Sequence, residues 1–347
     1  MPPVAPFYYG YLMAVAAIAG LAYGGWWTLT PAALVFVVVP VLDGIIGVSL
    51  WNPNAAEEAL GQADVRYRWI MWLWIPLALA VTAAAIVHAA SPHVGWPERI
   101  GLAVGIGLMN GTIGITYAHE LVHRPGRIEP LLGELLLLLV SYPHFRVEHV
   151  FGHHRFVATP RDPATARFGE TFYAFWPRSV GGQITSAWSL ERERLARRGV
   201  SPWTTQNRML CYAVVLLTLY AALAITSGPL GTFVFALQSL VAFSSLEVIN
   251  YIEHYGLLRR KNDTGRYEVT QPRHSWNAGH ALSNEFLINL ARHSDHHAVA
   301  SRRYQILRTF AADEVPQMPY GYGTMYLIAL APPLWFRLMN PRARAWA

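Results

Sequence analysis

The sequence predicts an all-α integral membrane protein of one domain, with six transmembrane helices and a histidine-rich cap on the cytoplasmic side. Three observations support this fold class. First, 53% of the 347 residues are hydrophobic and only 14% are charged, whereas a soluble domain has about 25% charged residues. Second, six segments are long and apolar enough to cross a bilayer, which takes about 20 residues. Third, nine of the fourteen histidines fall into four short clusters outside the centres of those segments.

The six predicted spans alternate with turn signals and polar segments. Thr30-Pro31 separates the first two, and Ser227-Gly228-Pro229 interrupts the uncharged stretch 209–246, which predicts a tight helical hairpin there. Two further apolar runs, 131–145 and 322–339, are short or interrupted, so we expect them to be interfacial or re-entrant. The predicted spans are residues 7–27, 32–51, 69–88, 100–117, 209–226 and 230–251.

The positive charges predict the orientation. Of 27 Lys and Arg residues, twelve lie in 119–208 and twelve in 255–347. The positive-inside rule therefore places segments 118–208 and 252–347, with both termini, on the cytoplasmic side of a bacterial inner membrane. Only Arg99, at the start of the fourth predicted span, departs from this rule. The net charge of +6 thus reflects topology, and we expect no nucleic-acid partner. No charged residue precedes Asp43, so we expect no cleaved signal peptide.

The histidine clusters predict a metal site. Residues three and four apart share a helix face, so His119 can point with His123, and His149 with His153. Imidazole binds iron, zinc and copper, and eight or nine ligands exceed the three or four of a zinc site. The sequence therefore predicts two metal ions at the cytoplasmic boundary, with open positions. The predicted ligands are His119, His123, His149, His153, His154, His254, His293, His296 and His297.

Several polar residues near the clusters are candidates for hydrogen bonds to metal-bound imidazoles, although ordinary surface charge explains any one of them equally well. These candidates are Glu120, Glu148, Glu247, Asn250, Glu253 and Asp295. Glu247 and Asn250 share a face of the sixth span with His254. Asp43 either lines a cavity or pairs near the boundary. His88 and His93 belong to the opposite side, and His144, His274 and His280 match no cluster spacing.

Three histidine boxes of the forms HxxxH, HxxxHH and HxxHH resemble the membrane di-iron superfamily of fatty acid desaturases and hydroxylases. The longer strings resemble the alkane 1-monooxygenase (alkane omega-hydroxylase) family, from the first spans to Met339-Asn-Pro341. Asn250-Tyr-Ile-Glu-His-Tyr-Gly-Leu257 is the most specific string, because desaturases lack it. Two departures from the family pattern are Val299-Ala300, where His-Pro is common, and the stretch Trp276-Asn-Ala-Gly-His280.

The resemblance implies two iron ions, an apolar hydrocarbon substrate drawn from membrane lipid, and terminal hydroxylation with O2. It also implies rubredoxin and rubredoxin reductase as electron donors. The sequence has one cysteine, Cys211, and no flavin or nicotinamide motif, so it requires an external carrier. A basic group could bind an acidic carrier or anionic lipid equally well; it comprises Arg259, Arg260, Lys261, Arg302 and Arg303.

Three alternatives remain open. A xylene-type monooxygenase shares the Asn-Tyr-x-x-His-Tyr-Gly string, and a fatty acid desaturase or hydroxylase shares the boxes. A metal transporter or sensor is the non-enzymatic alternative, although its ligands should lie near the bilayer midplane. The glycines of the fourth predicted span serve either close helix packing, which we favour, or a channel wall.

Overall fold

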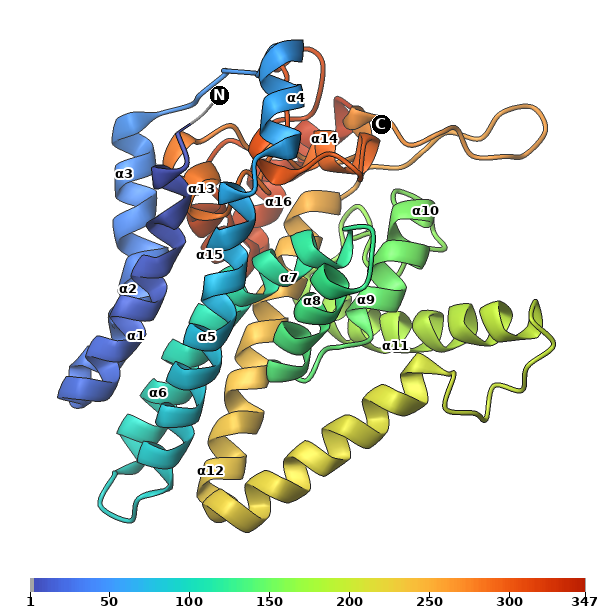
Figure 1. Ribbon diagram of the computed structural model, residues 1–347. Coiled ribbons are helices and arrows are strands. Elements are labelled where there is room, and N and C mark those ends of the chain that lie inside the picture. Colours follow the sequence, from blue (N-terminus) through green and yellow to red (C-terminus); the bar gives the residue numbers. More distant parts are fainter. Residues whose placement is uncertain (1–2, 347) are drawn as a thin grey trace.

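The structure is a computed structural model that describes residues 3–346, so the first two residues and the last of the predicted domain lie outside it. Within that range the regular structure is helical, apart from three isolated β-bridges. Long helices extend in one direction from a group of short helices and loops (Figure 1). The predicted all-α class is therefore confirmed.

The N-terminal part forms two antiparallel apolar stretches. The first comprises η1 (Ala5–Tyr11) and α1 (Leu12–Tyr23), and the second comprises η2 (Gly25–Leu29), α2 (Thr30–Ala33), η3 (Leu34–Val38) and α3 (Val39–Ile46). Each ends four or five residues before the predicted boundary. The reason is backbone conformation, because Gly24 and Gly47 have φ of 61° and 83° and end the helices. Val48 then pairs with His280 in a β-bridge.

The next two long helices are α5 (Arg66–Ala90), preceded by α4 (Ala55–Ala63), and the continuous run Trp96–Val122. That run comprises α6 (Trp96–Met109), the π-helical η4 (Asn110–Gly114) and α7 (Ile115–Val122). Arg99, which the charge distribution left unexplained, is buried. It donates to the carbonyl oxygens of Ala89 and Ser91, both at 2.8 Å, and so satisfies acceptors at the end of α5.

Small residues allow α6 to pack closely. A Cβ atom on Gly107 would lie 2.7 Å from the Gln238 carbonyl oxygen, and one on Gly105 would lie 2.9 Å from that of Thr28. The glycines of this helix therefore serve close helix packing, as we favoured. Gly111 serves both purposes, because it abuts Ala242 and also lines a cavity.

The middle of the chain leaves the bundle and returns. It forms α8 (Ile128–Leu139), α9 (Phe145–Glu148), the π-helical η5 (His149–His153), α10 (His154–Phe156) and the long α11 (Phe172–Ala196). Then α12 (Arg208–His254) runs in two arms that meet at Gly228, where φ is 64°. Figure 1 shows these arms as a V. The helix break predicted at Ser227-Gly228-Pro229 is confirmed, although the two arms diverge and do not pack together as a tight hairpin.

The C-terminal part packs over one end of the bundle. It comprises η6 (Pro272–His274), α13 (Ala281–Phe286), α14 (His293–Ala298), η7 (Tyr304–Ile306), α15 (Tyr322–Ala329) and α16 (Pro332–Arg344). Five helical stretches of the described chain are long and apolar enough to cross a membrane, and the fifth contains the Gly228 break. Runs 131–145 and 322–339 are not among them, as expected. These stretches are Ala5–Tyr23, Gly25–Ile46, Ala55–Ala90, Trp96–Val122 and Arg208–His254.

Candidate metal centre and its cavity

Five elements bring the nine predicted histidines to one place at the end of the bundle. His119 lies in α7 and His123 directly follows it. His149 and His153 belong to η5, and His154 begins α10. His254 ends α12, and the remaining three belong to α14. Segments far apart in the chain therefore supply a single buried cluster.

The nine histidines form two groups, one of five and one of four. The group of five comprises His119, His123, His149, His154 and His296, and the group of four comprises His153, His254, His293 and His297. Within each group, one possible ligand atom per residue lies within 4.8 Å of the others. The two groups are adjacent, because the rings of His154 and His297 stack at 4.6 Å between centroids.

The second box divides between the groups in an unexpected way. His149 was expected to point with His153, its i+4 neighbour, but the structure groups it with His154. The cause is the π-helical turn from His149 to His153, since a π turn aligns residues five apart. His149 Nε2 consequently lies 3.1 Å from His154 Nε2 and 3.0 Å from His123 Nε2.

The geometry of the nitrogens fits metal ligation. In the group of four, Nε2 of His297 lies 2.9 Å from that of His293 and 3.2 Å from that of His153. Imidazole nitrogens lie about 2.1 Å from a bound metal, so neighbours at a right angle are about 3 Å apart. Among the described residues, both ring nitrogens of His119 are buried and have no hydrogen-bond partner. Lone pairs that face one another without a donor are the arrangement that a cation stabilises.

Burial keeps these side chains uncharged. Desolvation lowers the pKa of His149, His154, His293, His296 and His297 well below its ordinary value, and the charges of neighbouring histidines lower it further. At neutral pH the rings are therefore neutral, which is the form that binds a metal ion.

The acidic candidates differ in the side chains to which they bond. Glu253 Oε2 lies 3.2 Å from His293 Nε2, and its other oxygen accepts from the Tyr322 hydroxyl. Glu120 pairs with buried Arg124, and Glu148 accepts from Ser186 at 3.3 Å. Thus, of these three, only Glu253 contacts a clustered histidine.

Three further candidates also bond elsewhere. Asp295 pairs with Arg302 and accepts from the Arg308 amide. Glu247 and Asn250 bond to each other at 3.2 Å, and in the described chain Glu247 also bonds to Gln183 and Tyr142 rather than to a clustered histidine. The sequence therefore suggested more carboxylates in contact with the histidine rings than the structure brings there.

Asp162 was missed as a site residue. Its Oδ2 accepts from His153 Nδ1 at 2.9 Å, and both side chains are buried. Asp162 also accepts from Thr165 Oγ1 at 2.6 Å, which fixes the carboxylate. The available signal was an acidic residue between Arg161 and Pro163, shortly after the second box.

The remaining histidines lie apart from both groups. His88 pairs with Glu98 at 3.0 Å, and His274 with Glu268 at 3.0 Å. His280 takes part in the bridge to Val48. His144 is buried against Tyr142, with ring centroids 4.2 Å apart.

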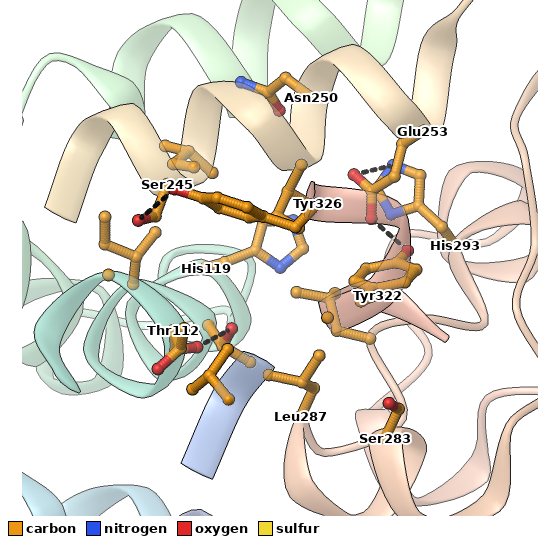
Figure 2. Close-up of a pocket in the computed structure, with 18 of the residues that line it drawn as sticks. Thr112, His119, Ser245, Asn250, Glu253, Ser283, Leu287, His293, Tyr322 and Tyr326 are labelled. Atoms are coloured by element: carbon orange, nitrogen blue, oxygen red, sulfur yellow. Dashed lines mark hydrogen bonds and ion pairs between the residues drawn. The ribbon is translucent and has the colours of Figure 1, made fainter. Parts of the chain in front are cut away.

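A narrow, mostly apolar cavity of about 80 Å³ ends at the histidines. His119, His149 and His293 lie at this end, together with Glu253 and Tyr322. Figure 2 shows Glu253 between His293 and Tyr322, with Tyr326 extending toward Ser245. Apolar residues of η3, α3, α7 and α12, and of α13 and its C-terminal cap, form much of the wall; they include Val35, Val39, Ile115, Leu246, Ile249, Phe286 and Leu287.

The position of residues along the helices gives the depth of the cavity. Ser245 precedes Glu253 by eight residues of α12, or about 12 Å of helix rise. Two π turns, η3 and η4, supply Val35, Gly111 and Thr112 to the wall. The cavity therefore reaches from the histidines into the apolar bundle, and it suits a long, thin, apolar molecule.

Comparisons with known proteins agree with this geometry. Residues 95–329 match the fatty acid desaturase family. The chain is 39% identical to alkane 1-monooxygenase 2 of Pseudomonas aeruginosa, over 97% of this chain and 92% of that protein. It is 40% identical to alkane 1-monooxygenase of Acinetobacter baylyi, over 88% of this chain and 74% of that protein. Identity to the xylene/toluene monooxygenase hydroxylase component of Pseudomonas putida is 29%, over 97% and 89%.

Proposed function

The chain belongs to the alkane 1-monooxygenase family, within the wider fatty acid desaturase family, and from this premise we propose that it hydroxylates the terminal C–H bond of alkanes with O2. The observation that carries the proposal is the apolar cavity that ends at both histidine groups. One oxygen atom enters the alcohol and the other leaves as water, which requires two electrons and two protons.

We propose that the two groups hold two iron ions, with all nine histidines as ligands. The donor set fits this assignment, because neutral imidazoles suit iron and the nine rings divide into two sets. Bound iron would supply the activation of O2 and the oxidation of the C–H bond. The protein would hold the ions in a buried site that excludes water, with the cavity as its apolar approach.

The cavity wall would bind the alkane by desolvation alone. An alkane has no polar group, so its affinity comes from burial, about 0.8 kcal/mol per CH₂ group. The wall side chains would align the chain along the cavity, with its terminal carbon toward His119, His149 and His293. A terminal rather than internal C–H bond then lies closest to the histidines, because the chain would enter the cavity with one end first.

Two acidic residues would position ligands. Asp162 holds the His153 ring in the tautomer whose Nε2 faces the group of four. Glu253, held by Tyr322, lies where it can accept a hydrogen bond or approach the ion of that group. We place Glu120, Glu148 and Asp295 outside these roles.

We propose rubredoxin, reduced by rubredoxin reductase, as the electron donor. Not every cation in the predicted basic group is available for docking. Arg303 is buried and pairs with Glu129, and Arg302 pairs with Asp295. Lys261 is exposed on the extended segment that projects at the upper right of Figure 1. Docking of an acidic carrier would use this lysine and the exposed arginines nearby.

We further propose a single membrane domain with six spans, because the two arms of α12 are each long enough to cross a bilayer once. The charge distribution supports cytoplasmic N- and C-termini in a bacterial inner membrane. The histidine-rich cap would then lie at the cytoplasmic boundary, within reach of a soluble carrier.

Octane turnover tests the function. Purified protein with iron, rubredoxin, rubredoxin reductase and NADH should give 1-octanol, and the metal content should be two irons per chain. His254→Ala should abolish turnover, whereas His88→Gln, on the Glu98 pair, should retain it. Bound iron without product from octane would refute the proposal. Product only from xylene would favour the aromatic alternative, and a double bond introduced into an acyl chain would favour a desaturase.

A further inference from the structure

The amide of Asn250 is an unusual group in the cavity wall. It lies on α12 four residues before His254, so it belongs to the end of the cavity nearest the histidines. Its side chain is buried, and its neighbours in the wall on the same helix include Leu246 and Ile249. A buried amide at this position needs hydrogen-bond partners, because desolvating an amide without a partner is unfavourable.

One half of this amide is fixed by Glu247. The Asn250 Nδ2 donates to Glu247 Oε1 at 3.2 Å, and the same oxygen accepts from Gln183 Nε2 at 2.8 Å and the Tyr142 hydroxyl at 3.1 Å. Because a carboxylate only accepts, the nitrogen of Asn250 must face it. The oxygen consequently takes the other side of the amide, and Figure 2 shows it on the cavity side.

The hydroxyl groups of the wall are engaged within the protein. Thr112 and Thr116 donate to carbonyl oxygens one turn earlier in their helix, at 2.6 Å each. Tyr322 donates to Glu253, and Ser283 to Asp43. Within residues 3–346, no donor is recorded for Asn250 Oδ1. The Asn250 carbonyl oxygen therefore faces an apolar cavity, where a ligand that carries a hydrogen-bond donor could bind to it.

An alkane offers no donor, but a primary alcohol does. We propose that Asn250 Oδ1 accepts a hydrogen bond from the hydroxyl group of a primary alkanol, bound with its hydroxyl toward the histidines and its chain along the cavity. This inference rests on the proposed function, since the alkanol is the product of that reaction. The product then binds more tightly than its chain length alone predicts, and Glu247 acts as the positioning residue that orients the amide.

Direct binding to the iron-loaded protein tests the inference without turnover. Two probes of equal length are compared, 1-octanol and 1-methoxyheptane, which has an ether oxygen and no O–H donor. Their Kd values follow from thermal stabilisation in detergent, corrected for partition into micelles. One net hydrogen bond predicts about fivefold tighter binding of 1-octanol.

Variants assign the effect to Asn250. Asn250→Leu should equalise the two Kd values, and Asn250→Ala serves if the leucine variant does not fold. The matched control is Thr116→Val, which removes a hydroxyl at the same end of the cavity and should retain the preference. Equal Kd values in the unaltered protein, or a preference that persists in Asn250→Ala, would overturn the inference. Failure of octane turnover would instead refute the proposed function, because the binding comparison does not depend on it.

Discussion

The contact between Asp162 and His153 gives a prediction that distinguishes the two histidine groups. Replacement of Asp162 with alanine removes the acceptor of His153 Nδ1, while His153 itself remains. The bond is charge-assisted, 2.9 Å long and buried, with Asp162 only 2% exposed. Bonds of this kind contribute about 1.5–3 kcal/mol, and loss of such partners lowers metal affinity about 10- to 100-fold. The two magnitudes agree, since 1.4 kcal/mol is about tenfold.

We expect the loss to affect one ion. His153 belongs to the group of four, so the ion of that group should leave about 10- to 100-fold faster to a chelator, while the ion of the group of five stays. The assay follows chelator-bound iron by absorbance and residual iron by mass spectrometry. Ser186→Ala, which removes the hydroxyl on Glu148, is the control. Equal release of both ions, or release unchanged from the parent protein, would refute the role given to Asp162.

Three further predictions follow from packing and burial. Tyr326 contacts Ser245 at 3.3 Å and Phe36 at 5.0 Å between rings, so Tyr326→Ala should raise the rate with hexadecane relative to octane, by about fourfold for each methylene newly buried. Tyr326→Phe should leave the ratio of the hexadecane rate to the octane rate unchanged. An unchanged ratio in the alanine variant would place the end of the cavity elsewhere. Burial lowers the pKa of His144 to about 4, so the folded state loses stability as pH falls from about 6.5 toward 4, since only the unfolded chain is protonated there. His144→Phe should remove about 2 kcal/mol of the destabilisation between pH 7 and pH 5, seen as a smaller drop in Tm, and an equal drop in both proteins would contradict this. Gly107→Ala should destabilise the protein by about 1–3 kcal/mol, because the new Cβ meets Val241 and Gln238, whereas Gly44→Ala meets nothing within 4 Å; equal Tm values for the two variants would refute the packing argument.

Much of the fold could be predicted from the sequence because its signals are local. A run of apolar residues is long enough to span a bilayer whatever its neighbours are, and Gly228 breaks a helix by its own backbone conformation. Helix ends were less accurate. The stretch that was expected to reach residue 51 ends at Ile46, since Val48 instead pairs with His280, far away in the chain.

The partners of the carboxylates could not be predicted for a related reason. Glu120, Glu148 and Asp295 each lie beside a clustered histidine in the sequence, yet they bond to Arg124, Ser186 and Arg302. Adjacent residues on a helix point about 100° apart, so closeness in the chain does not aim two side chains at the same place. Asp162 reaches His153 because the chain turns back after α10, and no spacing rule describes that turn.

The sequence by itself determined that the protein is helical and apolar, and that nine histidines occur in clusters able to share helix faces. Only the tertiary structure decided which histidines belong together. His153 and His154 are neighbours in the chain but join different groups, as do His296 and His297. The physical reason is the rotation of about 100° per residue about a helix axis, which a π turn reduces in the second box, so that His154 comes within 3.1 Å of His149.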